Sequence, residues 1–162
     1  MANQCNYCPD DINASGYITG KQSGVYAYLS ASAATTITAA QTYYPISGSF
    51  INEPIKNFTA VADPAIRYDG TLTQYFKIDW HASVQANIAS TTINIGIKKN
   101  TNLQVGTMST FCKNANETYT LSGTCVISLA TNDEIQLVVT SDGSDNIINF
   151  VNFTTTISEF FD

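Results

Sequence analysis

Charged side chains are scarce in this sequence. Only 12% of the 162 residues are charged, seven are Lys or Arg, and the formal net charge is −6. Binding to nucleic acid requires several cations that neutralise phosphates, and docking on an anionic membrane requires a basic cluster. The sequence has no basic stripe, so we expect neither kind of partner.

Long apolar runs are also missing. The first residues, MANQCNYCPDD, contain neither the basic nor the apolar segment of a signal peptide. No window of the sequence reaches the apolar length that a membrane span needs. We therefore expect a protein that is made in a cytosol without export and does not insert into a membrane.

Catalytic and metal-binding motifs are absent as well. Asp79, His81 and Ser83 are the residue types of a catalytic triad. On one strand, however, they would project in parallel about 6.6 Å apart, whereas triad members must converge. The acidic residues fall mainly in turns, which argues against the paired carboxylates of a glycosidase. We expect no enzyme, no catalytic residue, no metal and no cofactor.

The four cysteines indicate no disulfide framework. Cys5 and Cys8 form a C-x-x-C pair without a second Cys/His pair at ligand spacing, so half of a metal site and two free thiols are the alternatives. Cys125 is expected in the core as an inert thiol. A bond from Cys125 to Cys112 is not expected, because Cys125 lies several residues along its strand.

Length and composition indicate one domain with a tail. A hydrophobic content of 44% can fill one core, and 11% aromatic residues disfavour intrinsic disorder. Residues 1–22 show neither a helical nor a strand period and end just before an apolar alternation begins. We predict an irregular N-terminal tail over residues 1–22 and one domain over residues 23–162.

Alternation of apolar and polar residues predicts strands throughout this domain and no helix. The organising stretch is 119–139, where two alternating arms flank a turn at 130–133. The longest alternation is 74–86. Further strands are expected at 25–29, 91–97 and 103–111, with a short pair on either side of Asp63-Pro64. The result is an all-β, two-sheet antiparallel sandwich.

The closing segment, NIINFVNFTTTISEFFD, has apolar residues on both parities. Ile148 and Phe150 occupy one parity, and Val151, Phe153 and Ile157 occupy the other. A strand that is apolar on both faces needs cover on both. We expect a second copy of the chain to cover one face; cover by the chain's own loops or tail is the alternative.

The order of these segments resembles a known fold. A Leu, a short acidic turn and then Ile-x-Leu-x-Val, from Leu129 to Val139, is similar to the penultimate strands of the tumour-necrosis-factor-like jelly roll. That fold is shared by complement heads and by many phage fibre heads. The pieces TTIT, YYPI, AIRYDG and QYFKI resemble the first half of phage-borne heads. The resemblance implies that Phe76 and Trp80 fill the core and that the last strand lies centrally in the inner sheet, whose outer side packs on a threefold axis.

The resemblance also implies a function. The chain is expected to be a non-enzymatic bacteriophage structural protein at the virion surface, assembled in the host cytoplasm: a homotrimeric head fibre, a capsid decoration or a fibre-tip module. The candidate subunit interface comprises Tyr26, Tyr28, Tyr75, His81, Ile148 and Phe150. The tail, with Cys5, Tyr7 and Cys8, would attach the trimer to a capsid or fibre protein. The loops expected to face outward, toward a host glycan or receptor, contain Asn100, Asn114, Asn116, Asp142 and Asp145. The alternatives are a secreted complement- or cytokine-like binding head and a carbohydrate-binding module.

Overall fold

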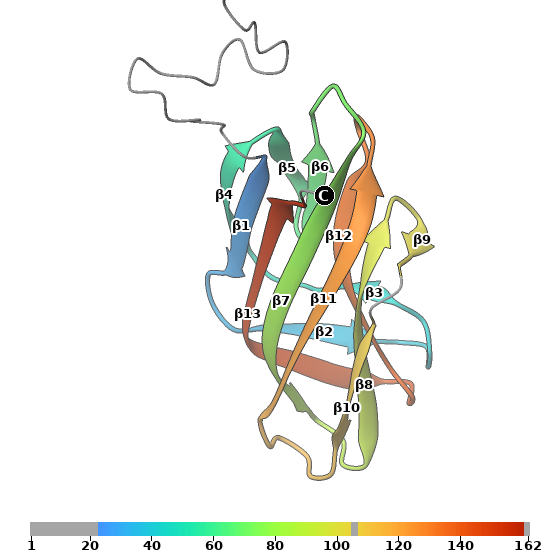
Figure 1. Ribbon diagram of the computed structural model, residues 1–162. Helices are drawn as coiled ribbons and strands as arrows, with labels where there is room; N and C mark the ends of the chain where they lie inside the picture. The colour runs from blue at the N-terminus through green and yellow to red at the C-terminus, as the bar shows by residue number, and fades with distance from the viewer. Residues whose placement is uncertain (1–22, 105–106, 161–162) are drawn as a thin grey trace, which may run out of the picture.

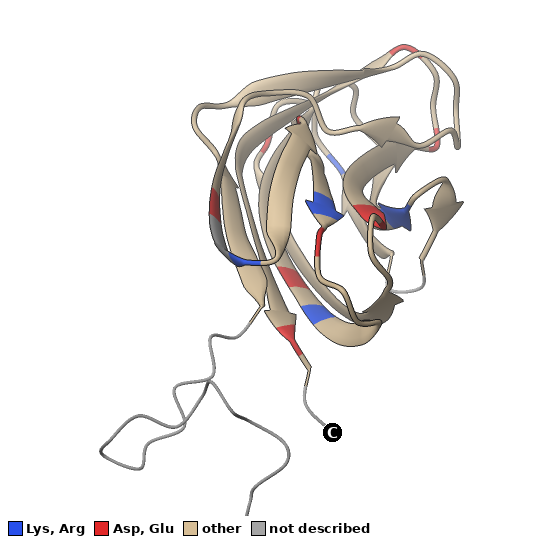
Figure 2. Cartoon of the chain, turned by 90° about the horizontal axis from the view of Figure 1, so that it is seen from above, with Lys and Arg blue, Asp and Glu red and all other residues tan. Residues whose placement is uncertain are grey.

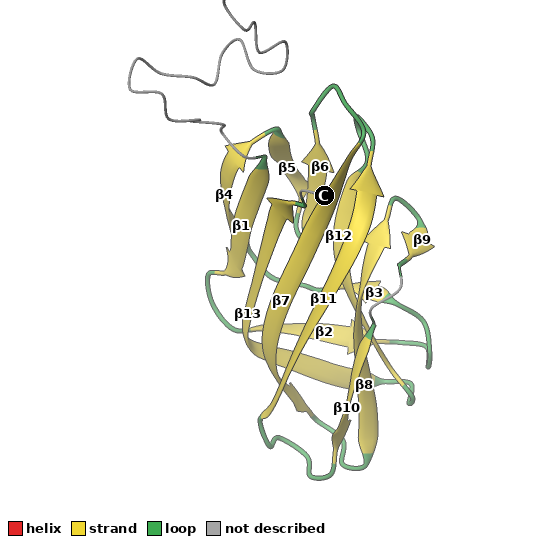
Figure 3. Ribbon diagram, in the orientation of Figure 1, coloured by secondary structure: helices red, strands yellow, loops and turns green. Residues whose placement is uncertain are grey.

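Residues 23–104 and 107–160 are described by the computed structural model, without the side chains of residues 54 and 55. They form two antiparallel β-sheets packed face to face (Figure 3). These residues contain no helix, and so none that is long and apolar enough to cross a membrane. The predicted all-β jelly-roll sandwich is confirmed. The predicted tail, with Cys5, Tyr7 and Cys8, lies outside the described residues.

The sheet that faces the viewer in Figure 1, named the front sheet, has six strands. Its order is β11-β7-β13-β1-β4, and β2 pairs with the first part of β13. Its strands are β1 (Gly24–Leu29), β2 (Ala33–Ile37), β4 (Phe50–Lys56), β7 (Gln74–Ala86), β11 (Tyr119–Leu129) and β13 (Asn146–Glu159). The last strand is therefore central, as expected.

The sheet behind it, named the back sheet, has seven strands. Its order is β10-β8-β12-β6-β5, with β3 beside β12 and β9 beside β8. Its strands are β3 (Tyr44–Pro45), β5 (Phe58–Ala62), β6 (Ala65–Tyr68), β8 (Thr91–Lys99), β9 (Asn102–Leu103), β10 (Met108–Cys112) and β12 (Glu134–Ser141). Since β11 belongs to the front sheet and β12 to the back sheet, the predicted corner at residues 130–133 is confirmed.

The single strand predicted at 103–111 is wrong. After β8 the chain folds straight back, and Leu103 pairs with Lys98 in the short strand β9. Gly96 of β8 makes room for this return, because a β-carbon there would lie 3.0 Å from the Leu103 side chain. The edge strand β10 then starts at Met108. Alternation alone cannot show that a strand is broken by such a fold-back.

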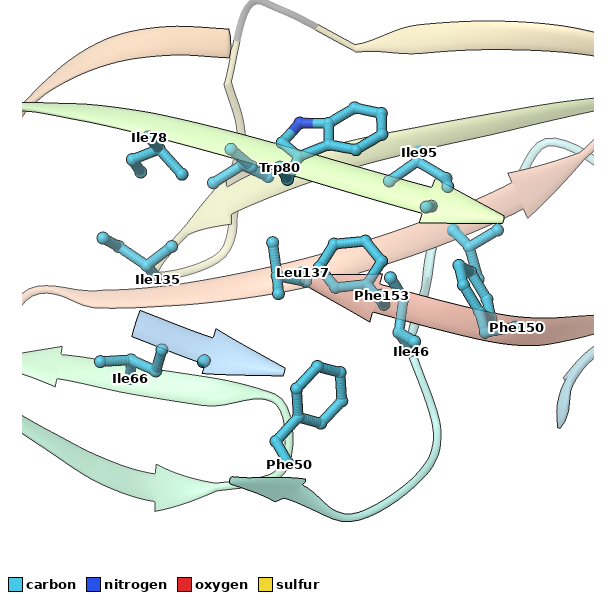
Figure 4. Close-up of a cluster of buried hydrophobic side chains, with 14 of the residues drawn as sticks. Ile46, Phe50, Ile66, Ile78, Trp80, Ile95, Ile135, Leu137, Phe150 and Phe153 are labelled. Atoms are coloured by element: carbon cyan, nitrogen blue, oxygen red, sulfur yellow. The ribbon is translucent and has the colours of Figure 1, made fainter. Parts of the chain in front are cut away.

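One core fills the space between the sheets. Phe76 and Trp80 of β7 have no exposed surface. Trp80 stacks on Phe153 of β13, with ring centroids 6.1 Å apart and 12° between the ring planes. Ile135 and Leu137 of β12 approach from the back sheet (Figure 4). Each such side chain stabilises the fold by about 1.5–3 kcal/mol through burial, which explains why the alternation of β7 and β12 predicts their strands so well.

The closing strand has a different geometry from the one its pattern suggests. Ile148 and Phe150 point into the core, then the pairing with β7 shifts by one residue between Phe150 and Asn152, and Phe153 and Ile157 point inward next. This β-bulge switches the inward parity in mid-strand. Ile148, Phe150, Phe153 and Ile157 therefore face the same core, while Ile147 and Val151 are exposed on the other side. The outer side of the strand is less apolar than its pattern suggests, because period-2 reasoning assumes an unbroken register.

The described chain starts and finishes at one end of the sandwich, named the entry end (Figure 1). The Glu159 carboxylate accepts hydrogen bonds from the Ser23 backbone N–H at 3.1 Å and from Gln74 Nε2 at 2.5 Å. The Tyr68 hydroxyl of the back sheet donates to Gln74 Oε1 at 2.8 Å. These bonds tie both chain ends to both sheets. The β7–β8 and β10–β11 loops lie at the opposite end, named the distal end.

Candidate functional site

The outer face of the front sheet points away from the core. One row across β1, β13, β7 and β11 holds Tyr26, Thr156, Asp79 and Thr124, and the next row holds Tyr28, Thr154, His81 and Ser122. Tyr75 lies on the same face, closer to the entry end. The structure thus brings together four residues predicted for a subunit interface: Tyr26, Tyr28, Tyr75 and His81.

The other two predicted interface residues do not belong to this face. Ile148 and Phe150 are completely buried inside the protomer. Their side chains cannot contact a second copy while the sandwich is intact. Their assignment to the interface is wrong, because the bulge after Phe150 was not visible in the sequence pattern.

Exposed apolar side chains gather on the outer face. Among the described residues thirteen large apolar side chains are exposed. Seven of them point outward from the front sheet, with Ile147 on the part of β13 that pairs with β2 and Phe160 beside Tyr75 just after β13: Tyr26, Ile51, Tyr75, Val126, Ile147, Val151 and Phe160. The other six are spread over turns and over β5, β9 and β10: Val61, Leu72, Ile88, Leu103, Met108 and Phe111. Such a concentration on one sheet face is typical of an interaction surface.

Charge is nearly absent from the centre of this face. Figure 2 shows how few charged residues interrupt the strands. Lys77 and Asp79 form an ion pair at 3.0 Å. Burial raises the pKa of Asp79, but hydrogen bonds from Lys77 and Thr124 outweigh it, so the pKa lies below its ordinary value. The pair therefore contributes almost no net charge, a composition that favours contact with another protein surface.

The residue types of a triad make no hydrogen bond to one another. Asp79 pairs with Lys77, and the Ser83 hydroxyl lies 3.5 Å from that of Thr120 on β11. His81 is exposed and stands between them on β7. Within the described residues, no three His, Cys, Asp or Glu side chains gather as a metal site would require. The face offers contact area and no catalytic geometry.

The distal end holds the loops that were expected to face outward. Asn114 Nδ2 and the Tyr119 hydroxyl both donate to the Glu117 carboxylate, at 2.7 and 2.8 Å, and these bonds lower the pKa of Glu117. Asn116 is exposed, with a positive φ of 60°. Asp142 accepts a hydrogen bond from the Thr92 N–H at 3.0 Å, and Asp145 is exposed in the next turn.

Asn100 does not belong with these loops. It lies beside the β11–β12 turn at the entry end, where Nδ2 donates to Asp133 and Oδ1 accepts from the Glu134 N–H, both at 2.9 Å. The Lys99 ammonium lies 2.8 Å from the Asp133 carboxylate in the same turn. Because both ends of its amide are occupied, Asn100 fixes the turn. Its assignment to a distal binding loop is wrong.

The two described cysteines are separate thiols. Cys112 and Cys125 are both buried and unpaired. Burial, with a smaller contribution from the Asp79 charge, raises the pKa of Cys125 to about 11. A thiol that stays protonated is a poor nucleophile, so the expectation of an inert core cysteine is confirmed.

Sequence reasoning missed five residues of the outer face: Ile51, Val126, Ile147, Val151 and Phe160. Val126 carried a usable signal, since it is an apolar residue at a position of β11 where its neighbours in the alternation, Thr124 and Ser128, are polar. Ile147 and Val151 were hidden by the parity switch in β13. Nothing in the sequence separated Phe160 from its apolar surroundings.

Two antiparallel sheets with this strand order and a central last strand define a jelly roll of the tumour-necrosis-factor-like class, the fold of complement heads. The structure aligns with Eiger TNF from S. frugiperda at a TM-score of 0.56 and 7% identity, over 87% of this chain and 94% of the other. It aligns with murine APRIL at a TM-score of 0.53 and 9% identity, over 85% of this chain and 99% of the other.

The PRD1 vertex protein P5 gives a TM-score of 0.49 at 14% identity, over 87% of this chain and 98% of P5. No protein-family model matches the sequence, and no curated protein matches it. At such low identities the likeness concerns the fold alone. The chain has the tumour-necrosis-factor-like jelly-roll fold, and its function has to be argued from its own surface.

Proposed function

We propose that this chain is a non-enzymatic head module that assembles into a homotrimer through the outer face of its front sheet. The observation that carries the proposal is that, of the thirteen large apolar side chains exposed among the described residues, seven point outward from that sheet. In a free protomer these apolar side chains are exposed to water, which is unfavourable in free energy. A second copy that covers them removes this unfavourable exposure.

The size of the face suits a protein partner. If each of the seven side chains exposes about 70–100 Å², together they present about 500–700 Å², which approaches the roughly 800 Å² that each partner contributes to a stable interface. The Thr and Ser hydroxyls between them add neutral hydrogen-bonding groups. Three copies rather than two are proposed because the tumour-necrosis-factor resemblance implies a threefold axis along this sheet.

The two ends of the sandwich differ in a way that fits a head held at one end. The described chain begins at Ser23 at the entry end, and residues 1–22 precede it. The loops with Asn114, Asn116, Asp142 and Asp145 lie away from the entry end. We propose that the segment of Cys5, Tyr7 and Cys8 attaches the trimer to a capsid or fibre protein of a bacteriophage. The distal loops then face outward at the virion surface, where a host glycan or receptor can bind.

A matched pair of variants tests the association. Val126 lies on the proposed interface and Val61 on β5 of the back sheet, and their exposed fractions are similar, 44% and 40%. A carboxylate buried at an interface without a partner is strongly unfavourable. We expect Val126→Glu to yield the monomer mass by light scattering at a concentration at which the wild type and Val61→Glu are trimers.

Equal masses for all three proteins would contradict the proposed interface. If Val61→Glu alone dissociates, the interface lies on the back sheet instead. The virion role has its own test: mass-spectrometric peptide mapping of purified phage particles should recover peptides of this chain. Consistent failure to find them, with the trimer intact, would leave the secreted binding head as the better assignment.

A further inference from the structure

Aspartate is followed by glycine at two places in the sequence, Asp69-Gly70 and Asp142-Gly143. An aspartate in this position can react with its own backbone, because glycine has no side chain to obstruct the approach of its nitrogen to the preceding carboxyl group. The first pair directly follows β6, and the second lies in the turn between β12 and β13. The hydrogen bonds around the two carboxyl groups differ, and this difference decides which pair can react.

Both oxygens of the Asp69 carboxylate are held by side chains. The Thr59 hydroxyl donates to Oδ2 at 2.5 Å, and Arg67 Nε donates to Oδ1 at 2.7 Å. These bonds outweigh the effect of burial and hold the pKa of Asp69 below its ordinary value. Gly70 is buried, and its carbonyl oxygen accepts a hydrogen bond from the Thr131 hydroxyl at 2.6 Å. Asp69 is therefore held in its charged form within a fixed turn.

The surroundings of Asp142 leave its carboxyl group freer. The residue is exposed, and Oδ1 accepts a hydrogen bond from the Thr92 N–H at 3.0 Å, while Oδ2 accepts none from the described residues. The Gly143 N–H likewise makes no hydrogen bond within the described part of the chain. The carboxyl carbon and the Gly143 nitrogen can therefore approach each other without breaking a bond of the fold.

We propose that Asp142-Gly143 is a modification site, at which aspartate isomerises to isoaspartate without an enzyme, and that Asp69-Gly70 is protected from this reaction. The Gly143 nitrogen attacks Cγ of Asp142 and gives up its proton, and the Oδ2 hydroxyl of the protonated carboxyl group leaves as water. A cyclic imide remains. Water then adds to the main-chain carbonyl of the imide and breaks its bond to the nitrogen. Gly143 stays attached to Cγ, so the main chain gains a methylene group and the former main-chain carbonyl becomes a free carboxylate.

The Thr92 N–H favours the first step. Negative charge develops on Oδ1 when the nitrogen adds to Cγ, and a donor that is already in place stabilises that charge. At Asp69, by contrast, Thr59 and Arg67 stabilise the unreactive carboxylate, and their bonds must break first. The loss of a hydrogen bond to a charged group slows a reaction by about tenfold or more. We therefore expect isoaspartate to form at least about tenfold faster at residue 142 than at residue 69.

The reaction would detach the turn from β8. Asp142 is bound to Thr92 twice, because its own N–H also donates to the Thr92 carbonyl oxygen, at 3.1 Å. In the product Cγ belongs to the main chain and the carboxylate is attached to Cα, so the side-chain contact with Thr92 is lost. The mass and the net charge stay the same, and only the shape of the turn changes. This inference does not depend on the proposed trimer or its role.

The experiment follows the full-length wild type and Arg67→Gln during incubation at mildly acidic pH, at a temperature at which fluorescence of Trp80, the one tryptophan, shows that each is folded. Peptide mapping by mass spectrometry with electron-transfer fragmentation distinguishes isoaspartate from aspartate at each position. We expect isoaspartate in the wild type at residue 142 and at least about tenfold less at residue 69. Arg67→Gln releases one oxygen of Asp69 and should raise the amount at residue 69.

The wild type in urea is the matched control. Both carboxyl groups lose their hydrogen bonds when the chain unfolds, so the two pairs should then react at similar rates. A folded wild type with no isoaspartate at residue 142, or with as much at residue 69, would overturn the inference. The same excess at residue 142 in urea would also overturn it, because the neighbouring residues rather than the fold would then be the cause. So would an Arg67→Gln chain whose residue 69 reacts no faster.

Discussion

The indole of Trp80 occupies the space where a side chain at residue 123 would be. Gly123 of β11 pairs directly with Trp80 of β7. A β-carbon added to Gly123 would lie 2.5 Å from Trp80 Cζ2, 2.6 Å from Cε2 and 2.8 Å from Met108 Cγ. Carbon atoms in contact are normally about 3.5–4.0 Å apart. The ring would therefore have to move by about 1 Å.

That movement is opposed on several sides. Trp80 has no exposed surface and stacks on Phe153. Overpacking of this kind costs about 1–3 kcal/mol, whereas replacing Gly by Ala stabilises by about 0.4–1 kcal/mol through the unfolded chain. We expect Gly123→Ala to lower the free energy of unfolding by about 1–2 kcal/mol.

Urea denaturation followed by Trp80 fluorescence measures this change, at one protein concentration because association also affects stability. Ser144→Ala, at an exposed position in the turn between β12 and β13, serves as the control and should leave the midpoint almost unchanged. A midpoint for Gly123→Ala equal to or above that of the wild type would refute the packing described for this edge of the sandwich.

Two further predictions concern the closing strand and the entry end. Deletion of Val151 removes the extra residue of the bulge and leaves Phe150 and Phe153 two positions apart, so both still point inward and circular dichroism should show a folded chain. Insertion of one alanine after Asn152 turns Phe153 and Ile157 outward instead, a loss of about 3–6 kcal/mol, and should unfold the chain. Burial raises the pKa of Asp133, but hydrogen bonds from Lys99, the Ala130 N–H and Asn100 outweigh it and hold the pKa below its ordinary value. The ionised carboxylate therefore stabilises the fold above about pH 4 and loses this effect as the pH falls through the lowered pKa. Asp133→Asn should melt earlier than the wild type at neutral pH by about 1 kcal/mol of stability, with the two melting curves converging in acid; a difference that does not change with pH would contradict this assignment.

The sequence predicted those strands whose alternation is uninterrupted. The strand β7 spans the residues expected for it, and the turn at 130–133 leads from one sheet to the other. In both cases apolar residues fill the inward positions and most outward positions are polar, with Tyr75 and Val126 as exceptions, so burial selects the register. The same reasoning failed where the backbone departs from a simple strand.

The closing strand shows why such departures escape a pattern. One extra residue at Val151 moves the inward face from Phe150 to Phe153. A bulge depends on the partner strand as well as on the residues of the bulged strand. The register against that partner cannot be derived from the local sequence. The expectation that a second copy covers this strand arose from that ambiguity. The surface that now supports association takes only Ile147 and Val151 from this strand.

The position of Asn100 shows a second limit. An Asn in a turn was expected to be free to bind, yet its amide bonds to Asp133 and Glu134, more than thirty residues later. Side chains of Asn and Asp satisfy backbone groups in turns as readily as they bind ligands. Only the contact between two distant turns distinguishes the two roles.

Sedimentation equilibrium of the wild-type chain at about pH 7.5 tests the central claim most directly. The account predicts a mass close to three times the 17.5 kDa of one chain, with dissociation only on strong dilution. A single-chain mass that persists at the highest attainable concentration would contradict it, because the apolar face of the front sheet would then be stable in water without a partner.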